Sequence, residues 1–201
     1  MLIDSAAFGA DKIYHLLIQT VVPRPIAWVI SDNGNGAYNL APFSFFNAVA
    51  SNPPILMISV GHKDDDSRKD TWVNIEARHD FVVHVPSGEH LPMVAASAEG
   101  LPHGHSEIDH LQLPLEKVEG QHLPRLKGPK VALFCTKYAI YEIGEDPQAL
   151  ILGKINHIWI DDSIITQTDG RWIINYAGLD PLARLGGSAY ALLGQKLSSR
   201  K

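Results

Sequence analysis

The sequence predicts a mainly β, barrel-type domain with short helices. Short apolar runs rich in β-branched and aromatic residues recur along the chain and are separated by Gly, Pro, Asn and Asp turns, while the helical patterns between them are short. A chain of 201 residues with 45% hydrophobic residues is long enough to bury a core of its own. Neither an internal repeat nor a low-complexity linker divides it, so residues 1–201 are expected to form one domain.

Charge and hydropathy argue against two classes of partner. The formal net charge is −5 and the Lys and Arg residues are scattered, whereas nucleic-acid-binding proteins generally carry a concentrated basic face. No basic segment precedes a long apolar run at the start, and no apolar run approaches the roughly 20 residues that a bilayer crossing needs. We therefore expect a cytoplasmic protein that binds neither nucleic acid nor membrane.

The first elements are a helix and a β-hairpin. Apolar residues at helical spacing predict a short helix or turn within residues 11–20, and Pro23 and Pro25 end it and force an extended entry into the first strand. Arg24, between the two prolines, is either an anion ligand or a cap for carbonyls at a sheet edge. Residues 26–31 form a β-prone run, and a turn follows before a second strand begins near Tyr38.

The turn of this hairpin contains Gly34 and Gly36, each following an Asn. Asn-Gly pairs supply the positive φ angles that a short hairpin turn needs. No third Gly completes a dinucleotide fingerprint and no Lys-Ser/Thr completes a P-loop, so the pair is explained by the turn.

The second half of this segment places polar side chains within an apolar run. The polar residues are Asn39, Ser44, Asn47 and Ser51, and the run includes Pro42, Phe43, Phe45 and Phe46. Buried amides and hydroxyls need partners, which a planar ligand rich in donors and acceptors would provide. The alternative is an ordinary strand with solvated polar positions. A further strand is expected at residues 55–60.

A charged stretch at residues 61–71 leads into a short helix expected at residues 72–77. Arg68 and Lys69 supply positive charge, Thr71 supplies a hydroxyl, and the first helical N–H groups supply oriented donors, which together outline an anion site. The alternative is a solvated charged loop. Because a carboxylate beside a phosphate is repulsive, Asp70 is expected to turn away and cap the helix.

The rest of the chain is predicted to continue the β pattern. We expect a strand at residues 81–85, a small helix at 91–98, a long hairpin of strands at 131–143 and 149–161, a short strand at 171–176, and a turn and short helix at 179–190. Cys135, the single cysteine, lies in a buried strand pattern, where an inert thiol is expected.

One cluster has the residue types of a metal site. It comprises His103, His105, Glu107, Asp109 and His110, which suit zinc or nickel. The run is polar, contains Gly104 and lacks a rigid helix such as HExxH, so an exposed loop is favoured and no metal site is predicted. A metal-dependent hydrolase is kept as the weaker alternative, and loss of activity on chelation would distinguish it.

Several motifs in order resemble those of one family. The blocks PRPIAWVIS, NLAPFSFFNAVASNPP, RKDTWVNI, FVVHV and LDPLARLGGSAY are similar to the flavin reductase-like FMN-binding split-barrel family, which includes flavoredoxins. The resemblance covers about residues 12–190. It implies a split β-barrel, FMN as the cofactor, and a homodimer with FMN close to the interface.

The resemblance also implies roles for particular residues. The wall of the flavin pocket would include Asn39, Ser44, Phe45, Phe46, Asn47 and Ser51, and the phosphate would lie at Arg68, Lys69, Asp70 and Thr71. His84 stands where relatives usually have Asn, and either a flavin contact or a core position is open to it. The tail of relatives folds back near the flavin, which adds Arg184 and Tyr190.

Two functions follow from this resemblance. The first is an NAD(P)H-dependent, flavin reductase-type oxidoreductase that passes electrons through FMN to a second flavin or another small-molecule acceptor. The second is an FMN electron carrier that serves protein partners without turnover. Hydride transfer needs neither a Ser-His-Asp arrangement nor paired carboxylates, so no catalytic residue is assigned.

Overall fold

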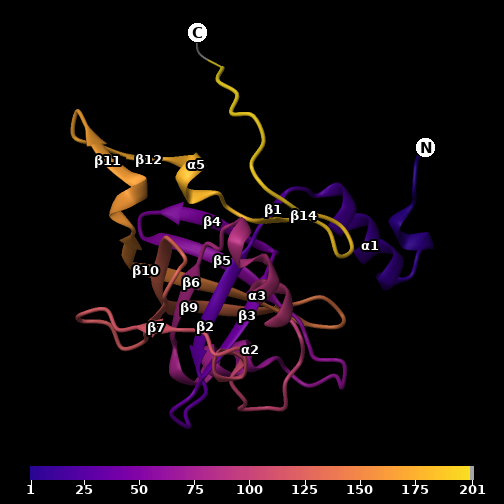
Figure 1. Ribbon diagram of the computed structural model, residues 1–201. Coiled ribbons are helices and arrows are strands. Elements are labelled where there is room, and N and C mark those ends of the chain that lie inside the picture. The colour runs from indigo at the N-terminus through magenta and orange to yellow at the C-terminus, as the bar shows by residue number, and fades with distance from the viewer. Residues whose placement is uncertain (200–201) are drawn as a thin grey trace.

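A seven-stranded antiparallel sheet forms the body of the protein in this computed structural model, which describes residues 1–199 (Figure 1). The strand order is β3-β2-β6-β9-β10-β5-β4. The strands are β2 (Ala27–Asp32), β3 (Tyr38–Phe43), β4 (Phe46–Ser51), β5 (Pro54–Val60), β6 (Asp80–His84), β9 (Val131–Ile143) and β10 (Gln148–Ile160). Because β3, at one edge, also contacts β5 near the other edge, the sheet curls into a barrel.

Three smaller sheets surround the barrel. A three-stranded sheet joins the two ends of the chain, with β13 between β1 and β14. The β11–β12 hairpin projects away from the barrel, followed by α5 (Figure 1). The strands of these sheets are β1 (Arg24–Pro25), β7 (Leu115–Glu116), β8 (Arg125–Leu126), β11 (Ile165–Thr168), β12 (Arg171–Ile174), β13 (Ala183–Arg184) and β14 (Tyr190–Ala191).

The helices are short, and two of them position the site described below. Helix α2 packs against β2, β3 and β9, and α4 packs against β3. The α-helices are α1 (Ala10–Thr20), α2 (Asp70–Arg78), α3 (Leu91–Ala96), α4 (Glu107–His110) and α5 (Tyr176–Leu179). The 3-10 helices are η1 (Ser5–Ala7), η2 (Gly88–His90) and η3 (Asp162–Ile164).

The core consists of two apolar clusters, one on each face of the sheet. Side chains alternate between the faces of a strand, so β2 sends Ala27 and Val29 into one cluster and Trp28 and Ile30 into the other. Helix α2 contributes Trp72 to the first cluster. Strand β2 is therefore buried on both faces and fixes the register of its neighbours β3 and β6.

Gly153 in β10 permits a close approach inside the barrel. A Cβ atom built at this position would lie 2.3 Å from the ring of Phe81, a distance that no side chain tolerates. The β9–β10 pairing shifts register between Leu152 and Gly153. The glycine therefore lets Phe81 fill the barrel interior while β10 bends around it.

Most of the predicted elements are confirmed. The hairpin forms from β2 and β3, and its turn places Gly34 and Gly36 at φ values of 76° and 88°. The N-terminal helix, the strand at 55–60, the strand at 81–85, the small helix after residue 91, the long β9–β10 hairpin and the strand after residue 171 are all present.

Three local predictions are wrong. The tail contains no helix between residues 180 and 190; instead β13 and β14 pair with each other and with β1, because this segment meets the distant residue Arg24. Asp70 does not cap α2, whose N-cap is Lys69 without a side-chain bond. The stretch at 103–110 is not wholly an exposed loop, because α4 begins at Glu107, a buried residue.

Within residues 1–199, no helix has the length and apolar character required to pass through a bilayer.

Candidate functional site

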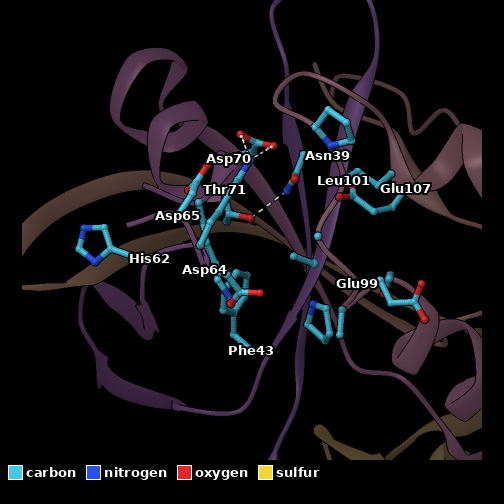
Figure 2. Close-up of a pocket in the computed structure, with 18 residues that line it drawn as sticks. Asn39, Phe43, His62, Asp64, Asp65, Asp70, Thr71, Glu99, Leu101 and Glu107 are labelled. Atoms are coloured by element: carbon cyan, nitrogen blue, oxygen red, sulfur yellow. Dashed lines mark hydrogen bonds and ion pairs between the residues drawn. The ribbon is translucent and has the colours of Figure 1, made fainter. Parts of the chain in front are cut away.

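A cavity of about 450 Å³ opens between β3, the start of α2 and the segment that follows α3 (Figure 2). Strand β3 contributes Asn39 and an apolar strip of Ala41, Pro42 and Phe43. Residues 62–65 and 69–71 form a second wall, and residues 97–102 with Glu107 form a third. Ligand pockets typically occupy about 300–1,000 Å³, so this cavity is large enough for a small organic molecule.

Asn39 and Thr71 join the β3 wall to α2. The Asn39 Nδ2 atom donates to Thr71 Oγ1 at 2.8 Å, as the dashed line in Figure 2 marks. Because Thr71 Oγ1 accepts this bond, its own O–H remains available as a donor. Asn74, one turn later, donates to Ser31 Oγ at 3.1 Å and so ties α2 to β2. These bonds hold the first turn of α2 in place beside the cavity.

Asp70 is buried in an ion-pair network. Lys63 Nζ lies 3.1 Å from both carboxylate oxygens, and His103 Nδ1 lies 2.5 Å from Oδ1. The carboxylate therefore neutralises Lys63 and orients the segment that carries His103. The sequence predicted that Asp70 would cap the helix. It does not, because its carboxylate is bound to Lys63 and His103.

Lys69 is the cation that the structure leaves available at the cavity. Its side chain is half-buried and forms no hydrogen bond or ion pair with residues 1–199. Burial lowers the pKa of Lys69 from its ordinary value, and the nearby Asp64 carboxylate opposes that shift. An anion in the cavity would give this ammonium group a partner.

Arg68, also predicted at the anion site, lies outside the cavity lining. Its guanidinium group donates to Glu76 at 2.9 Å and to Glu142 at 2.6 Å, and it lies 4.2 Å from the centre of the Trp72 ring. Two carboxylates and an aromatic face thus occupy this side chain. The cavity brings together only Lys69, Asp70 and Thr71 of the four predicted phosphate residues.

The structure places the remaining residues of the predicted pocket wall elsewhere, apart from Asn39. Ser44 accepts a bond from Arg24 Nε at 3.3 Å, and the Phe45 ring lies 6.4 Å from that of Tyr14. Phe46 packs against the first core cluster. Asn47 and Ser51 lie on the exposed part of β4. The cavity lining of this single chain includes none of the five residues Ser44, Phe45, Phe46, Asn47 and Ser51.

His84 is a core residue whose two ring nitrogens are both bound. Nδ1 donates to Trp28 O at 3.0 Å, and Nε2 accepts from the Leu126 N–H at 3.0 Å, which requires the neutral ring. Burial lowers the pKa of His84 to about 4; the Trp28 carbonyl opposes this shift, while Arg125 and His90 reinforce it. His84 therefore connects β2 to β8 and is not part of the cavity lining.

This pKa predicts an acid-dependent loss of stability. Between pH 6.5 and about 4 the unfolded chain protonates His84 while the folded protein does not, so the free energy of unfolding falls as the pH falls through that window. The slope from this group approaches about 1.4 kcal/mol per pH unit. Urea unfolding at several pH values should show a shallower acid slope in His84→Gln than in the wild type. His157→Gln, at an exposed position, is the matched control, and equal slopes for wild type and His84→Gln would contradict the assignment.

Arg184 and Tyr190 contact each other rather than the cavity lining. The guanidinium carbon of Arg184 lies 4.4 Å from the Tyr190 ring centre, and Nη2 donates to Gly187 O at 2.5 Å. The two residues are partners in the β13–β14 pairing. Their predicted place beside a flavin stays a prediction.

Cys135 lies in the core, and two residues of the His-rich stretch have partners in other segments. Burial raises the pKa of the Cys135 thiol, as predicted for an inert cysteine. No group of three or more His, Cys, Asp or Glu side chains within residues 1–199 is arranged to hold a metal ion. His103 instead pairs with Asp70, and Glu107 accepts from the Leu40 N–H at 2.9 Å.

Sequence comparison decides the family. Residues 19–176 match the model of the flavin reductase like domain. The chain belongs to the flavin reductase-like family. The resemblance drawn from the PRPIA, NLAPFS and KDT blocks is thereby confirmed, and so is the mainly β split-barrel fold.

Three solved structures of the flavin reductase-like fold are similar over nearly the whole chain. Nitrilotriacetate monooxygenase component B from Bacillus cereus is 31% identical with a TM-score of 0.90, covering 98% of both chains. The 2-nitrobenzoate 2-nitroreductase NbaA of Pseudomonas fluorescens is 25% identical with a TM-score of 0.86, covering 100% of this chain and 98% of that one. Flavoredoxin of Desulfovibrio vulgaris (Miyazaki F), 18% identical with a TM-score of 0.75 and covering 99% and 97%, shares the fold.

Sequence reasoning missed several residues of this flavin reductase-like chain's cavity. Lys63 and Glu107 line it, as does the segment at residues 97–102. Phe43 also lines the cavity. It belongs to the apolar run of the sequence, but the predicted flavin pocket included the following residue, Ser44, and not Phe43 itself. The sequence offered one indication for Glu107. The apolar residue Ile108 follows it, and an apolar residue within a polar stretch is typical of a turn packed against the core rather than of a solvated loop.

Proposed function

We propose that this protein binds FMN and is an oxidoreductase that passes electrons from NAD(P)H through FMN to a second flavin or another small-molecule acceptor. The single observation that carries the proposal is the cavity at the start of α2, where an unpaired Lys69 and the Thr71 hydroxyl lie beside an apolar strip of β3. This combination suits a ligand with an anionic end and a planar ring.

The anionic end fits the α2 corner. The first helical donor is the Trp72 N–H, which bonds to Lys69 O at 2.9 Å, so the N–H groups of Asp70 and Thr71 have no partner in the ladder of α2. The negative charge of Asp70 is matched by Lys63 at 3.1 Å, which leaves the charge of Lys69 for a phosphate. Ala41, Pro42 and Phe43 present the apolar surface on which a ring can pack.

The chain's own task in such a reaction is to bind and orient. Bound FMN supplies the redox chemistry, because its ring accepts a hydride and passes electrons on. Lys69 and Thr71 would hold the phosphate, and the Asn39–Thr71 bond would keep the hydroxyl aimed at it. Hydride transfer does not require a side chain that acts as a general base, so the proposed function needs no catalytic residue in this chain.

The relatives support an enzyme over a simple carrier. Of the three solved structures described above, the two at 25% identity or more are a monooxygenase component and a nitroreductase. The similarity to flavoredoxin is in fold alone. NAD(P)H as the donor implies a cytoplasmic setting for the reaction.

We further propose that the protein is a homodimer. Large apolar side chains are exposed on β4 and on the projecting hairpin: Val49 is 56% exposed and Trp172 is 67% exposed. A twofold contact is the commonest way to cover such surfaces. It would also bring β4 and the C-terminal strands of one chain close to a neighbouring site, where the predicted residues outside the cavity lining could take part.

Anaerobic stopped-flow mixing tests the proposed function. Protein loaded with FMN is mixed with NADH or NADPH, and the visible absorbance of oxidised FMN is followed. We expect at least one nucleotide to bleach the flavin rapidly and repeatedly when a second flavin is supplied. A protein that binds FMN but is bleached only by a chemical reductant would be a carrier, and a protein that binds no flavin would refute the proposal.

A further inference from the structure

Glu107 is a buried carboxyl group in the wall of the cavity. Its residue is 7% exposed, it begins α4, and it lines the cavity together with Asn39, Asp70 and Thr71. In Figure 2, Asn39 is drawn between Thr71 and Glu107. Glu107 thus lines the same cavity as Lys69 and Thr71, at which the anionic end of a ligand is proposed to bind.

The position of Glu107 is set by bonds to the edge of the sheet. Its Oε2 atom accepts from the Leu40 N–H of β3 at 2.9 Å, and the preceding residue, Ser106, donates to Tyr38 O at 2.7 Å. Ser106 also accepts from the Asp109 N–H and so caps α4. The carboxyl group is therefore held against β3 and cannot move far from the cavity.

No cation within residues 1–199 forms an ion pair with Glu107. Lys63, whose charge acts on Glu107, is bound to both oxygens of Asp70. Burial raises the pKa of Glu107, and the Asp70 carboxylate raises it further, while the N–H groups of Leu40 and of Glu107 itself and the charge of Lys63 act in the opposite direction. The charged and titratable groups that share this cavity are His62, Lys63, Asp64, Asp65, Lys69, Asp70 and Glu99, with His103 on Asp70.

We propose that Glu107 is a binding residue of the cavity that takes up a proton from solvent when the phosphate of FMN binds. The inference rests on the proposed function. An anion placed near an unpaired, desolvated carboxylate strongly favours its neutral form. The protonated carboxyl keeps one oxygen as acceptor for Leu40 and gains an O–H donor for the ligand.

The sign of the resulting pH dependence follows from linkage. The phosphate raises the pKa of Glu107 above its value in the free protein. At pH values between the pKa of the free protein and that of the FMN complex, FMN binding therefore takes up a proton. Within that window FMN affinity falls as the pH rises, with a limit of about tenfold per pH unit for one proton. Riboflavin lacks the phosphate, so its affinity should not depend on whether Glu107 is ionised.

Titrations of the flavin-free protein with FMN and riboflavin over about pH 6 to 8, a range that also spans the second phosphate ionisation, test the inference. Glu107→Gln retains an acceptor for Leu40 but cannot titrate. We expect it to bind FMN more tightly than the wild type as the pH rises, by up to about tenfold for each pH unit between the free and bound pKa of Glu107, with a flatter pH profile and unchanged riboflavin affinity. Asp109→Asn removes an exposed carboxylate of the same helix and should keep the wild-type profile.

The outcomes separate this inference from the proposed function. If wild type and Glu107→Gln bind FMN with the same pH profile, or if riboflavin shares the wild-type dependence, the role of Glu107 is refuted while FMN binding stands. If the wild type binds neither flavin, both proposals are refuted. If Glu107→Gln does not fold, calorimetry of Lys69→Arg, whose guanidinium group does not titrate, is run in two buffers of different ionisation enthalpy: proton uptake with FMN but not with riboflavin supports the inference, and no uptake with FMN or equal uptake with both flavins overturns it.

Discussion

Replacing Lys69 and Thr71 together by Ala is expected to weaken FMN binding by about 100-fold or more, because each removes a hydrogen bond to a charged group worth roughly 1.5–3 kcal/mol. Lys69 is the cavity cation without an internal partner, and Thr71 carries the hydroxyl that Asn39 orients. Riboflavin has the same ring without the phosphate, so its affinity should change little. Fluorescence titration of both flavins against both proteins measures the difference.

Two controls make this result specific to the phosphate. Lys117→Ala removes an exposed lysine outside the cavity and should leave both affinities unchanged. Because Thr71 is buried and bonded to Asn39, its replacement could also destabilise the fold. Thermal unfolding of the double variant therefore has to show that the protein is still folded at the temperature of the titration. An equal loss for FMN and riboflavin would remove the phosphate from this corner.

The strands of the barrel could be predicted because their determinants are local. β2 is read from a short apolar run bounded by a Pro and an Asn-Gly turn, and the β9–β10 pair from two long β-prone runs around a turn. The tail could not be predicted in the same way. Residues 183–191 form strands only because β1 supplies their partner from the other end of the chain, and helical or extended patterns of so few residues are locally equivalent.

The sequence predicted the site residues that lie at the start of a helix next to charged residues. It did not predict the positions of residues that are set by contacts with distant parts of the chain. Lys69 and Thr71 belong to the first turn of α2, so sequence neighbours are also neighbours in space. Arg68 is one residue earlier, but it turns to Glu142, a partner 74 positions away. Glu107 reaches the cavity through its bond to Leu40, and the residue types around it had suggested a solvated loop.

The same reasoning explains the outcome for Asp70. A carboxylate at a helix start is typically a cap, and this expectation ignores any cation brought in by tertiary structure. Here Lys63 and His103 converge on it from two different segments, and a buried carboxylate is stabilised more by the Lys63 ammonium group and a side-chain contact with His103 than by one backbone N–H. The local rule was overridden by an ion-pair network that only the folded chain creates.

Arg24 offers the largest expected effect on stability. Its guanidinium group is buried and donates to the carbonyls of Ile18 at 2.5 Å, Val21 at 2.8 Å and Leu185 at 2.9 Å. Of the two roles that the sequence left open, capping carbonyls is thus the one observed. The bond to Ile18 is buried and the other two are part-buried, so Arg24→Leu strands one buried carbonyl, at roughly 1–3 kcal/mol, and removes two further bonds from a charged donor; the total loss should be about 3–5 kcal/mol. For a chain of this size that lowers the melting temperature by about 10 °C.

Thermal unfolding followed by circular dichroism measures this loss, and Arg171→Ala, at an exposed arginine, is the matched control. Arg24→Lys should lie between wild type and Arg24→Leu, because one ammonium group reaches fewer of the three carbonyls than a planar guanidinium does. These carbonyls belong to the N-terminal helix, the segment that follows it and the β13–β14 turn, so the loss should appear first as earlier unfolding of the paired chain ends. A folded Arg24→Leu protein with unchanged melting temperature and weakened FMN binding would instead make Arg24 an anion ligand, and it would show that the two chain ends are held together by other contacts.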